Sequence, residues 1–322
     1  MSKTDKIPGH ANKSFRFVQL SDLHLSSPGL PNPYRLFNKR ILGYLSWLKK
    51  RRFIHRRKIL DHAIDEIAKL NADHLVITGD LLHIGLKNEF EQSAEWLARF
   101  DSPADITIIP GNHDLYVKEK WSRSFNYWHE FMIGDHTPDF QSIDNDNALD
   151  KLNALYPVIR IRKDVAFIGI SSVFESPWFR ATGFICKEQL NRLERILTNP
   201  DYRDFCKVLL VHHPVTLTHT KPRKCLLNHE ELTALIAESP VDLILHGHEH
   251  KTSVEYIKST GNKNIPVVGI ASSSSASVNQ AMRAEFALYE IQKHDSAWNI
   301  KMNSFKFNAS EGKFEHANAM PL

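Results

Sequence analysis

The chain has 322 residues, 42% of them hydrophobic and 24% charged, and a net charge of +4, which excludes a disordered chain. It has no apolar run of about 18 residues, so a membrane-spanning helix is not expected. The three cysteines form no closely spaced pair, which argues against a disulfide framework and favours a cytoplasmic location.

Short apolar runs alternate with helical patterns along the chain. The first run, Phe15–Leu20, predicts a strand, and a helical pattern extends from Leu60 to Leu70. Further strands are predicted at residues 74–78, 105–109, 165–170, 207–211, 241–245 and 265–270, and further helices at 88–100, 187–197 and 230–237. Residues 285–291 and 298–307 predict an antiparallel pair. The alternation predicts a layered α/β fold, with residues 1–322 as one domain.

Polar side chains follow five of the predicted strands. Because ligands of layered α/β proteins bind beyond the carboxyl ends of strands, we expect these side chains to share one crevice. The residues are Asp22, His24, Asp80, Asn112, His113, Asp114, His212, His248 and His250.

The donor types in this set suit two metal ions. Carboxylate, amide and imidazole ligands without a thiolate favour manganese, iron or zinc. Two ions about 3.5–4 Å apart can clamp the attacking and leaving oxygens of a phosphoryl displacement. A water shared by two cations readily loses a proton and becomes the nucleophile. We interpret the other histidines, His55 among them, as surface or core residues, and we favour a structural role for His83, His213 and His246 beside the motifs.

The five motifs resemble those of the calcineurin-like metallophosphoesterase superfamily. They are Asp22-x-His24, Gly79-Asp80, Gly111-Asn112-His113-Asp114, His212-x-Pro214 and Gly247-His248-x-His250, within residues 15–270. The resemblance implies an α/β (α+β) four-layer sandwich of two mixed β-sheets flanked by helices, with a helical cap formed by insertions.

The resemblance also implies a role for each residue. Asp22, His24 and His250 would bind the first metal ion, and Asn112, His212 and His248 the second. Asp80 would bridge the two ions. His113 would protonate the leaving oxygen or hold the phosphate, and Asp114 would orient the His113 ring.

The first insertion, residues 31–58, is basic. Residues 23–60 carry ten Lys or Arg and no Asp or Glu, and the rest of the chain has 31 basic and 37 acidic residues. Phe37, Ile41, Leu45 and their neighbours recur at helical spacing, which predicts a basic amphipathic helix. It either packs on the core with a solvated basic face or contacts an anionic membrane surface. Nucleic acid is disfavoured because no recognisable module is present. We expect the metal site, on other loops, to be independent of residues 49–52.

The second insertion, residues 116–156, is rich in aromatic residues. Trp121, Phe125 and Trp128 either form the wall of an apolar substrate pocket or the core of a small helical cap.

The sequence as a whole predicts a two-metal phosphohydrolase. The expected substrate is a phosphodiester or pyrophosphate, carried on a phosphorylated small molecule or on a lipid at the inner face of the membrane. The alternatives are a soluble cyclic-nucleotide phosphodiesterase and a metal-site scaffold without catalysis.

Overall fold

The computed structural model describes residues 14–100, 102–135, 142–218, 220–294 and 297–322. Two six-stranded β-sheets form the centre of this part of the chain. The first sheet has the order β12 (Lys313–Pro321), β11 (Ala297–Asn308), β10 (Glu285–His294), β1 (Phe15–Leu20), β2 (His74–Ile77) and β3 (Ile106–Ile108). The second has the order β4 (Val158–Arg162), β5 (Val165–Gly169), β6 (Cys206–Leu210), β7 (Leu243–His246), β9 (Asn264–Gly269) and β8 (Ser253–Lys258).

Both sheets are mixed. Strands β1, β2 and β3 are parallel, whereas β10, β11 and β12 extend the first sheet in antiparallel fashion. Strands β5, β6, β7 and β9 are parallel and are flanked by antiparallel β4 and β8. The predicted antiparallel pair is confirmed by the β10–β11 register from Glu285–Lys306 to His294–Ala297. The parallel strands place their carboxyl ends, and the loops that follow them, at one edge of each sheet.

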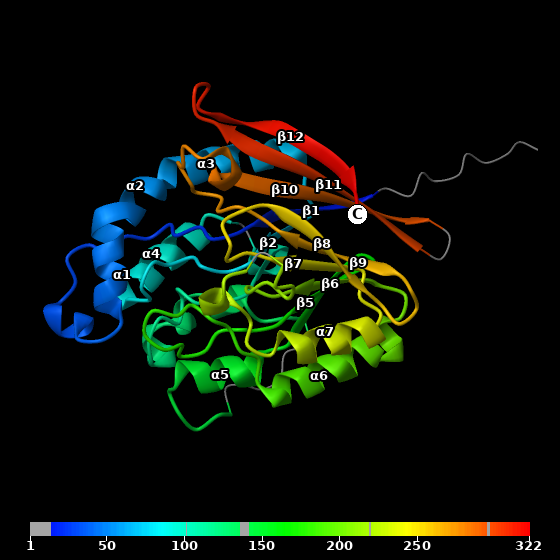
Figure 1. Cartoon of the computed structure of the whole chain (residues 1–322), viewed down its shortest axis with the longest axis horizontal. Coiled ribbons are helices and arrows are strands. Elements are labelled where there is room, and N and C mark those ends of the chain that lie inside the picture. Colours follow the sequence, from blue (N-terminus) through cyan, green and yellow to red (C-terminus); the bar gives the residue numbers. More distant parts are fainter. Residues whose placement is uncertain (1–13, 101, 136–141, 219, 295–296) are drawn as a thin grey trace, which may run out of the picture.

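Helices flank the two sheets and complete four layers (Figure 1). Helices α3 (Arg57–Ile67) and α4 (Lys87–Leu97) share the larger core with both sheets. Helices α6 (Lys187–Thr198) and α7 (His229–Glu238) share the second core with the other face of the second sheet. In β5, Val165 and Phe167 belong to the first core and Ala166 and Ile168 to the second, as the alternation of side chains along a strand requires. The predicted four-layer sandwich is confirmed.

Some elements carry no clear signal in the sequence. They are β4, β8, β12 and the helix α5 (Ala148–Leu155). Strand β12 shows the reason, because it lies at the sheet edge and most of its side chains are exposed. A strand without a buried face lacks the apolar alternation by which strands are recognised.

The first insertion forms a helical arm at one end of the sandwich (Figure 1). The helical arm, residues 40–54, consists of α1 (Arg40–Ser46), a π-helical segment (Trp47–Arg51) and α2 (Arg52–Ile54). The helix is thus confirmed, although none of the helices in the described residues is long and apolar enough to cross a bilayer.

The arm does not bury its apolar stripe on the core. The side chains of Phe37, Ile41 and Leu45 are 77%, 40% and 44% exposed. One basic side chain of the arm faces inward: buried Arg40 donates from Nε to the Ile84 carbonyl at 3.0 Å and from Nη2 to Glu119 at 3.0 Å. The interpretation of a helix packed on the core with a solvated basic face is contradicted at Arg40, whereas the exposed lysines of the arm agree with it. A buried guanidinium needs acceptors, and remote loops supply them here.

The aromatic residues of the second insertion belong to the main core. Trp121, Phe125 and Trp128 are buried, and Phe125 and Trp128 pack against Phe90 of α4 with ring centroids 5.2 and 5.5 Å apart. This packing favours the core interpretation over an apolar substrate pocket for these side chains. Part of the insertion, residues 136–141, lies outside the described residues.

Candidate metal centre

Loops at the carboxyl ends of five strands carry the candidate ligands. Three of the loops follow β1, β2 and β3 of the first sheet, and two follow β6 and β7 of the second. The loops hold one another through backbone hydrogen bonds, such as Asp22 N–H to the Gly79 carbonyl at 3.0 Å and Gly247 N–H to the His212 carbonyl at 3.1 Å. All the predicted ligands are buried except His250, which is partly exposed. The expected common crevice is formed.

The first cluster contains Asp22, His24, Asp80 and His250. One ligand atom from each lies within 4.8 Å of every other. Asp22 Oδ1 is 3.1 Å from His250 Nε2, and Asp80 Oδ2 is 4.0 Å from His24 Nε2. These are the residues expected for the first ion, together with the bridging carboxylate.

The second cluster contains Asp80, His212 and His248, again within 4.8 Å of one another. Asp80 Oδ2 lies 3.4 Å from His212 Nε2, and the Asn112 amide oxygen lies 3.2 Å from the same nitrogen. Asp80 thus belongs to both clusters. The structure brings together all seven predicted metal ligands.

Buried atoms without partners test whether these residues fit metal ions. The ring nitrogens His24 Nε2 and His248 Nε2 are buried and make no hydrogen bond. An unpaired buried polar atom costs about 1–3 kcal/mol, so two such nitrogens, one in each cluster, call for a ligand. The converging oxygen and nitrogen atoms of the two clusters fit a pair of divalent cations.

The ligand loops have an unusual backbone. Asp22, His24, Asp80, His248 and His250 all have positive φ angles, between 40° and 72°. Residues other than glycine adopt this region at a cost and mostly where surrounding structure enforces it, as at functional sites. The shared backbone conformation indicates that the fold holds these side chains in place before any ion binds.

Two glycines allow the close approach of the loops. A Cβ atom at Gly111 would overlap the carboxylate and backbone nitrogen of Asp80, and one at Gly247 would overlap the Ser21 hydroxyl. Each motif therefore needs its glycine because a larger residue would prevent the neighbouring loop from packing this closely, and not only because the chain turns there.

The His113 ring is oriented by a carbonyl. His113 Nδ1 donates to the His83 carbonyl oxygen at 2.5 Å. The Asp114 carboxylate accepts instead from the backbone N–H groups of Asp80, Leu82 and Gly111, at 2.8 to 3.0 Å. The role predicted for Asp114 is therefore wrong: it holds the ligand loops together, because its short side chain is saturated by nearby backbone donors.

Arg51 of the helical arm reaches the same site. Its Nη1 lies 3.0 Å from His113 Nδ1. Because Nδ1 already gives its hydrogen to His83, it cannot accept one from the guanidinium. No acidic partner of Arg51 is found in the described part of the chain, so its donors remain available to an anion. The expectation that residues 49–52 are independent of the site is wrong, because the arm folds back over it.

The electrostatics of the crevice suit a cation. Burial would raise the pKa of Asp22, but His250 and Ser21 hold it well below its usual range. Burial would lower the pKa of His212, but the charge of Asp80 raises it to about 9. Burial, and then the charge of Arg51, lower the pKa of His113. The carboxylate of Asp80 thus stabilises positive charge on the His212 ring beside it, and it would stabilise a bound metal cation in the same way.

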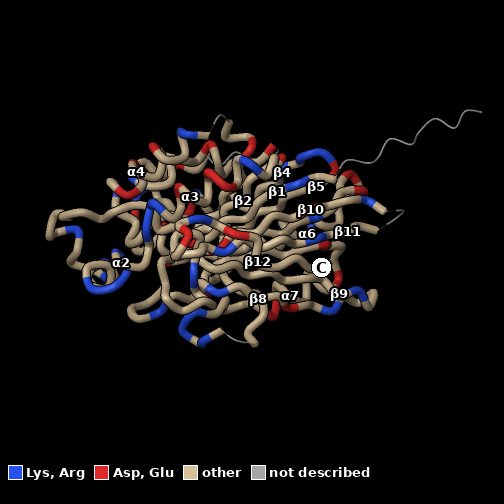
Figure 2. The backbone as a smooth tube through the Cα atoms, turned by 90° about the horizontal axis from the view of Figure 1, so that it is seen from above, with Lys and Arg blue, Asp and Glu red and all other residues tan. Residues whose placement is uncertain are grey.

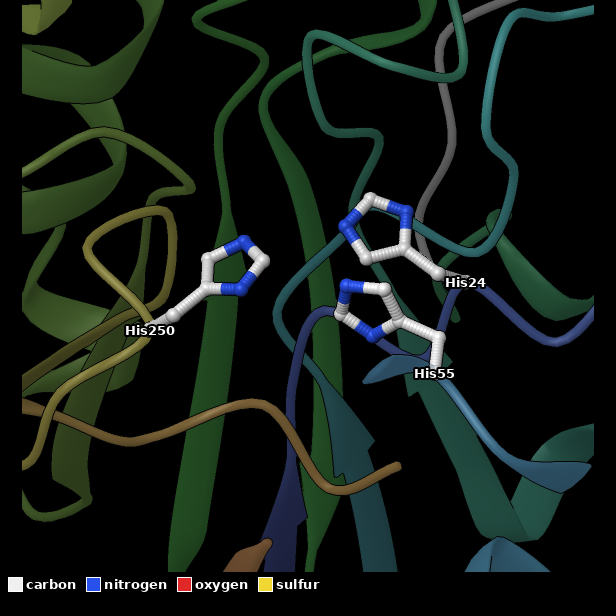
Figure 3. A group of neighbouring side chains, drawn as sticks. All are labelled: His24, His55 and His250. Atoms are coloured by element: carbon white, nitrogen blue, oxygen red, sulfur yellow. The ribbon is translucent and has the colours of Figure 1, made fainter. Parts of the chain in front are cut away.

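The sequence missed one histidine in this site. His55, at the end of the arm, lies beside His24 and His250 (Figure 3), with its ring centroid 4.4 Å from that of His24. No motif surrounds it, and its only signal is its place in the basic insertion that follows the first metal motif. Of the three histidines beside motifs, His213 contacts Ser172 at 2.8 Å and His246 contacts the Gly247 carbonyl at 3.0 Å, while the His83 ring stacks on His24.

Comparison with known proteins agrees with this geometry. The family model for calcineurin-like phosphoesterases matches residues 15–252. The chain belongs to the calcineurin-like phosphoesterase family. It is a metal-dependent phosphoester hydrolase by family, and its site has the carboxylate and imidazole groups for a binuclear divalent metal centre.

A known sequence and a solved structure are both similar to this chain. A protein of Vesicomyosocius okutanii named as a probable cyclic nucleotide phosphodiesterase is 23% identical over 242 residues, covering 74% of this chain and 80% of its own length. A dimetal phosphatase from Danio rerio has a similar fold, with a TM-score of 0.59 and 13% identity over 95% of this chain and 98% of its own.

Proposed function

We propose that the chain hydrolyses a phosphodiester or pyrophosphate bond with two divalent metal ions bound by the two clusters. The proposal depends on Asp80, the one carboxylate that belongs to both clusters. Manganese, iron or zinc ions at these ligands would supply charge stabilisation for the phosphoryl group and an activated water.

Two further side chains can act on the substrate. Arg51 and His113 lie in contact beside the clusters, and no acidic partner of the Arg51 guanidinium is found among the described residues. A guanidinium binds phosphoryl oxygens well because its planar donors match their geometry. A phosphate held by Arg51 would lie beside His113, and the protonated ring would give a proton from Nε2 to the leaving alkoxide of a diester.

We further propose that the substrate is presented at an anionic membrane surface, as a lipid-linked phosphoester or pyrophosphate. The arm supports this, because it reaches the metal centre through Arg51 and turns apolar side chains to solvent. Basic residues surround these side chains, and Figure 2 shows Lys and Arg gathered around α2. The exposed apolar residues on and beside the arm are Leu30, Tyr34, Phe37, Ile41, Leu45, Phe53, Trp178 and Phe179.

Two of these exposed residues, Trp178 and Phe179, belong to a loop that is attached to the first insertion at Lys39. Lys39 Nζ donates to the carbonyls of Ser176 and Arg180 at 3.1 and 3.0 Å, on either side of Trp178 and Phe179. Exposed apolar area combined with cationic side chains is the pattern of elements that lie in a membrane interface. Several such residues on one surface exceed the scattered exposure normal for a soluble protein.

A soluble cyclic nucleotide is the second candidate substrate. Its support is the relative from Vesicomyosocius okutanii, whose name describes that activity. A metal-site scaffold without catalysis is a weaker candidate, because no residue of the expected ligand set is missing from the sequence or lies away from the clusters.

A substrate panel separates the candidates. The purified protein with Mn²⁺ would be offered cyclic nucleotides, a small soluble phosphodiester, and a nucleotide-linked lipid in anionic vesicles. We expect the highest kcat/KM on the lipid-linked pyrophosphate and loss of all activity with a chelator. Preference for a cyclic nucleotide would favour the second candidate, and no turnover of any phosphoester would overturn the proposed catalysis.

The charges of the arm provide a sharper prediction. We expect the combined change Lys49→Gln, Lys50→Gln and Arg52→Gln to weaken binding to anionic vesicles. Each cation contributes about 1 kcal/mol there, so three account for roughly a hundredfold. Hydrolysis of a small soluble diester should stay at the parent rate, because these three side chains point to solvent.

Arg51→Gln is the matched variant, because it removes one charge from the same helix. It should keep most of the vesicle binding. Turnover of the small diester should fall about 10- to 100-fold, because that factor corresponds to the loss of one hydrogen bond to a charged group. Unchanged vesicle binding by the triple variant would show that the basic surface of the arm does not contact the membrane.

A further inference from the structure

A third histidine lies at the first metal position. One ring nitrogen each of His24, His55 and His250 lies within 4.8 Å of the other two. Figure 3 shows the three rings facing a common space from three different segments of the chain. Two nitrogens bound to one ion are at most about 4.2 Å apart, given metal–nitrogen distances near 2.1 Å. The observed spacing therefore needs little closure to bring all three nitrogens onto one ion.

Hydrogen bonds determine which nitrogen of His55 is free. Nδ1 lies 2.9 Å from the Ser274 hydroxyl and 3.3 Å from the Ser272 hydroxyl. Ser272 gives its own hydrogen to the Asp22 carbonyl at 2.6 Å and can only accept from His55. Nδ1 therefore carries the hydrogen, and Nε2 has the free lone pair. A ligating histidine usually has its second nitrogen held in this way, which orients the ring.

The backbone holds His55 in position as well. His55 N–H donates to the Arg51 carbonyl at 2.9 Å, and Arg56 N–H donates to the Ser274 carbonyl at 2.9 Å. A β-bridge joins His55 to Ser275. The end of the arm is thus attached to the loop after β9, and the ring cannot move without breaking these contacts.

We propose that His55 Nε2 is a further ligand of the first metal ion, beside Asp22, His24, Asp80 and His250. This inference rests on the proposed two-metal function. Carboxylate and imidazole ligands in this number suit manganese or iron better than a four-coordinate zinc ion. The end of the arm, which also carries Arg51, would then contribute to the metal centre directly.

His55→Phe tests the inference, because phenylalanine keeps a ring against His24 but has no nitrogen. Mn²⁺ binding would be measured by calorimetry and by metal content after dialysis, with folding checked by circular dichroism. We expect the parent to bind two ions and the variant to bind one of them at least about 10- to 100-fold more weakly. The rise in Tm on adding Mn²⁺ should shrink in parallel.

His83→Phe is the control, because the His83 ring also stacks on His24, at 5.1 Å, but belongs to neither cluster. It should bind two ions with parental affinity. Parental stoichiometry and affinity in His55→Phe would overturn the inference and leave the proposed function intact. A parent protein that binds no metal would overturn the proposed function, and this inference with it.

A structure of the metal-loaded parent gives a test that does not depend on the folding of a variant. We expect His55 Nε2 at about 2.0–2.3 Å from the first ion, the range of metal–nitrogen bonds. A nitrogen that lies beyond bonding distance in the loaded protein would show that His55 only packs against the ligands.

Discussion

Asp80→Asn is expected to abolish hydrolysis and to lower the metal content below two ions per chain. The side chain keeps its shape, and its remaining oxygen can still accept from the His113 N–H, which donates to Asp80 Oδ1 at 2.7 Å. The negative charge shared by both clusters is lost. Metal-ion catalysis stabilises the transition state by several kcal/mol, so kcat should fall by about a thousandfold or more.

The measurement is kcat on a small soluble phosphodiester, together with metal content after dialysis against Mn²⁺. Asp61→Asn is the control, because Asp61 pairs with Arg99 on the surface at 2.8 Å and takes part in neither metal cluster. It should match the parent in both measurements. An Asp80→Asn protein with two bound ions and the parental kcat would show that this carboxylate does not bridge the ions.

His113→Ala is expected to keep both metal ions and to lose rate. His113 belongs to neither cluster, and its Nδ1 is engaged by the His83 carbonyl. If it protonates the leaving oxygen, kcat on a diester with a poor leaving group should fall about 10²–10⁴-fold, the usual value of general acid catalysis.

The leaving group distinguishes an acid from a phosphate-binding residue. Nitrophenolate departs without a proton. If His113 is the general acid, the loss of kcat in His113→Ala should therefore be smaller on nitrophenyl esters. An equal loss of kcat on substrates with good and with poor leaving groups would show that His113 binds the phosphate, the role proposed for Arg51. Arg51→Gln should show that equal loss in either case, since a guanidinium does not release its proton.

The arm shows where inference from the sequence stops. The spacing of Ile41 and Leu45 predicts its helix. The spacing does not predict whether these apolar side chains face the core or the solvent, and the structure shows them exposed. Amphipathic patterning assumes that the apolar side is buried. Here Arg40 is buried instead, because the Ile84 carbonyl and Glu119 provide acceptors from segments more than 40 residues away.

Asp114 and His55 show the same limit at single residues. The place of Asp114 next to His113 in sequence suggested contact with the imidazole ring. The backbone donors of Gly111, Asp80 and Leu82 bind its carboxylate instead. His55 carries no motif, and its bridge to Ser275 and its hydrogen bond to Ser274 hold it beside the ligands of the first ion.

The sequence by itself determined the family and the layered fold, and it predicted seven metal ligands that the structure brings close together. Each ligand directly follows a strand that is recognisable as an apolar run, and parallel strands present their ends at one edge, so local order is enough to place these side chains together. Only the tertiary structure decided that the arm turns its apolar stripe outward and brings Arg51 and His55 to the metal centre. Those placements depend on hydrogen bonds between residues far apart in the chain, and local patterning carries no information about such partners.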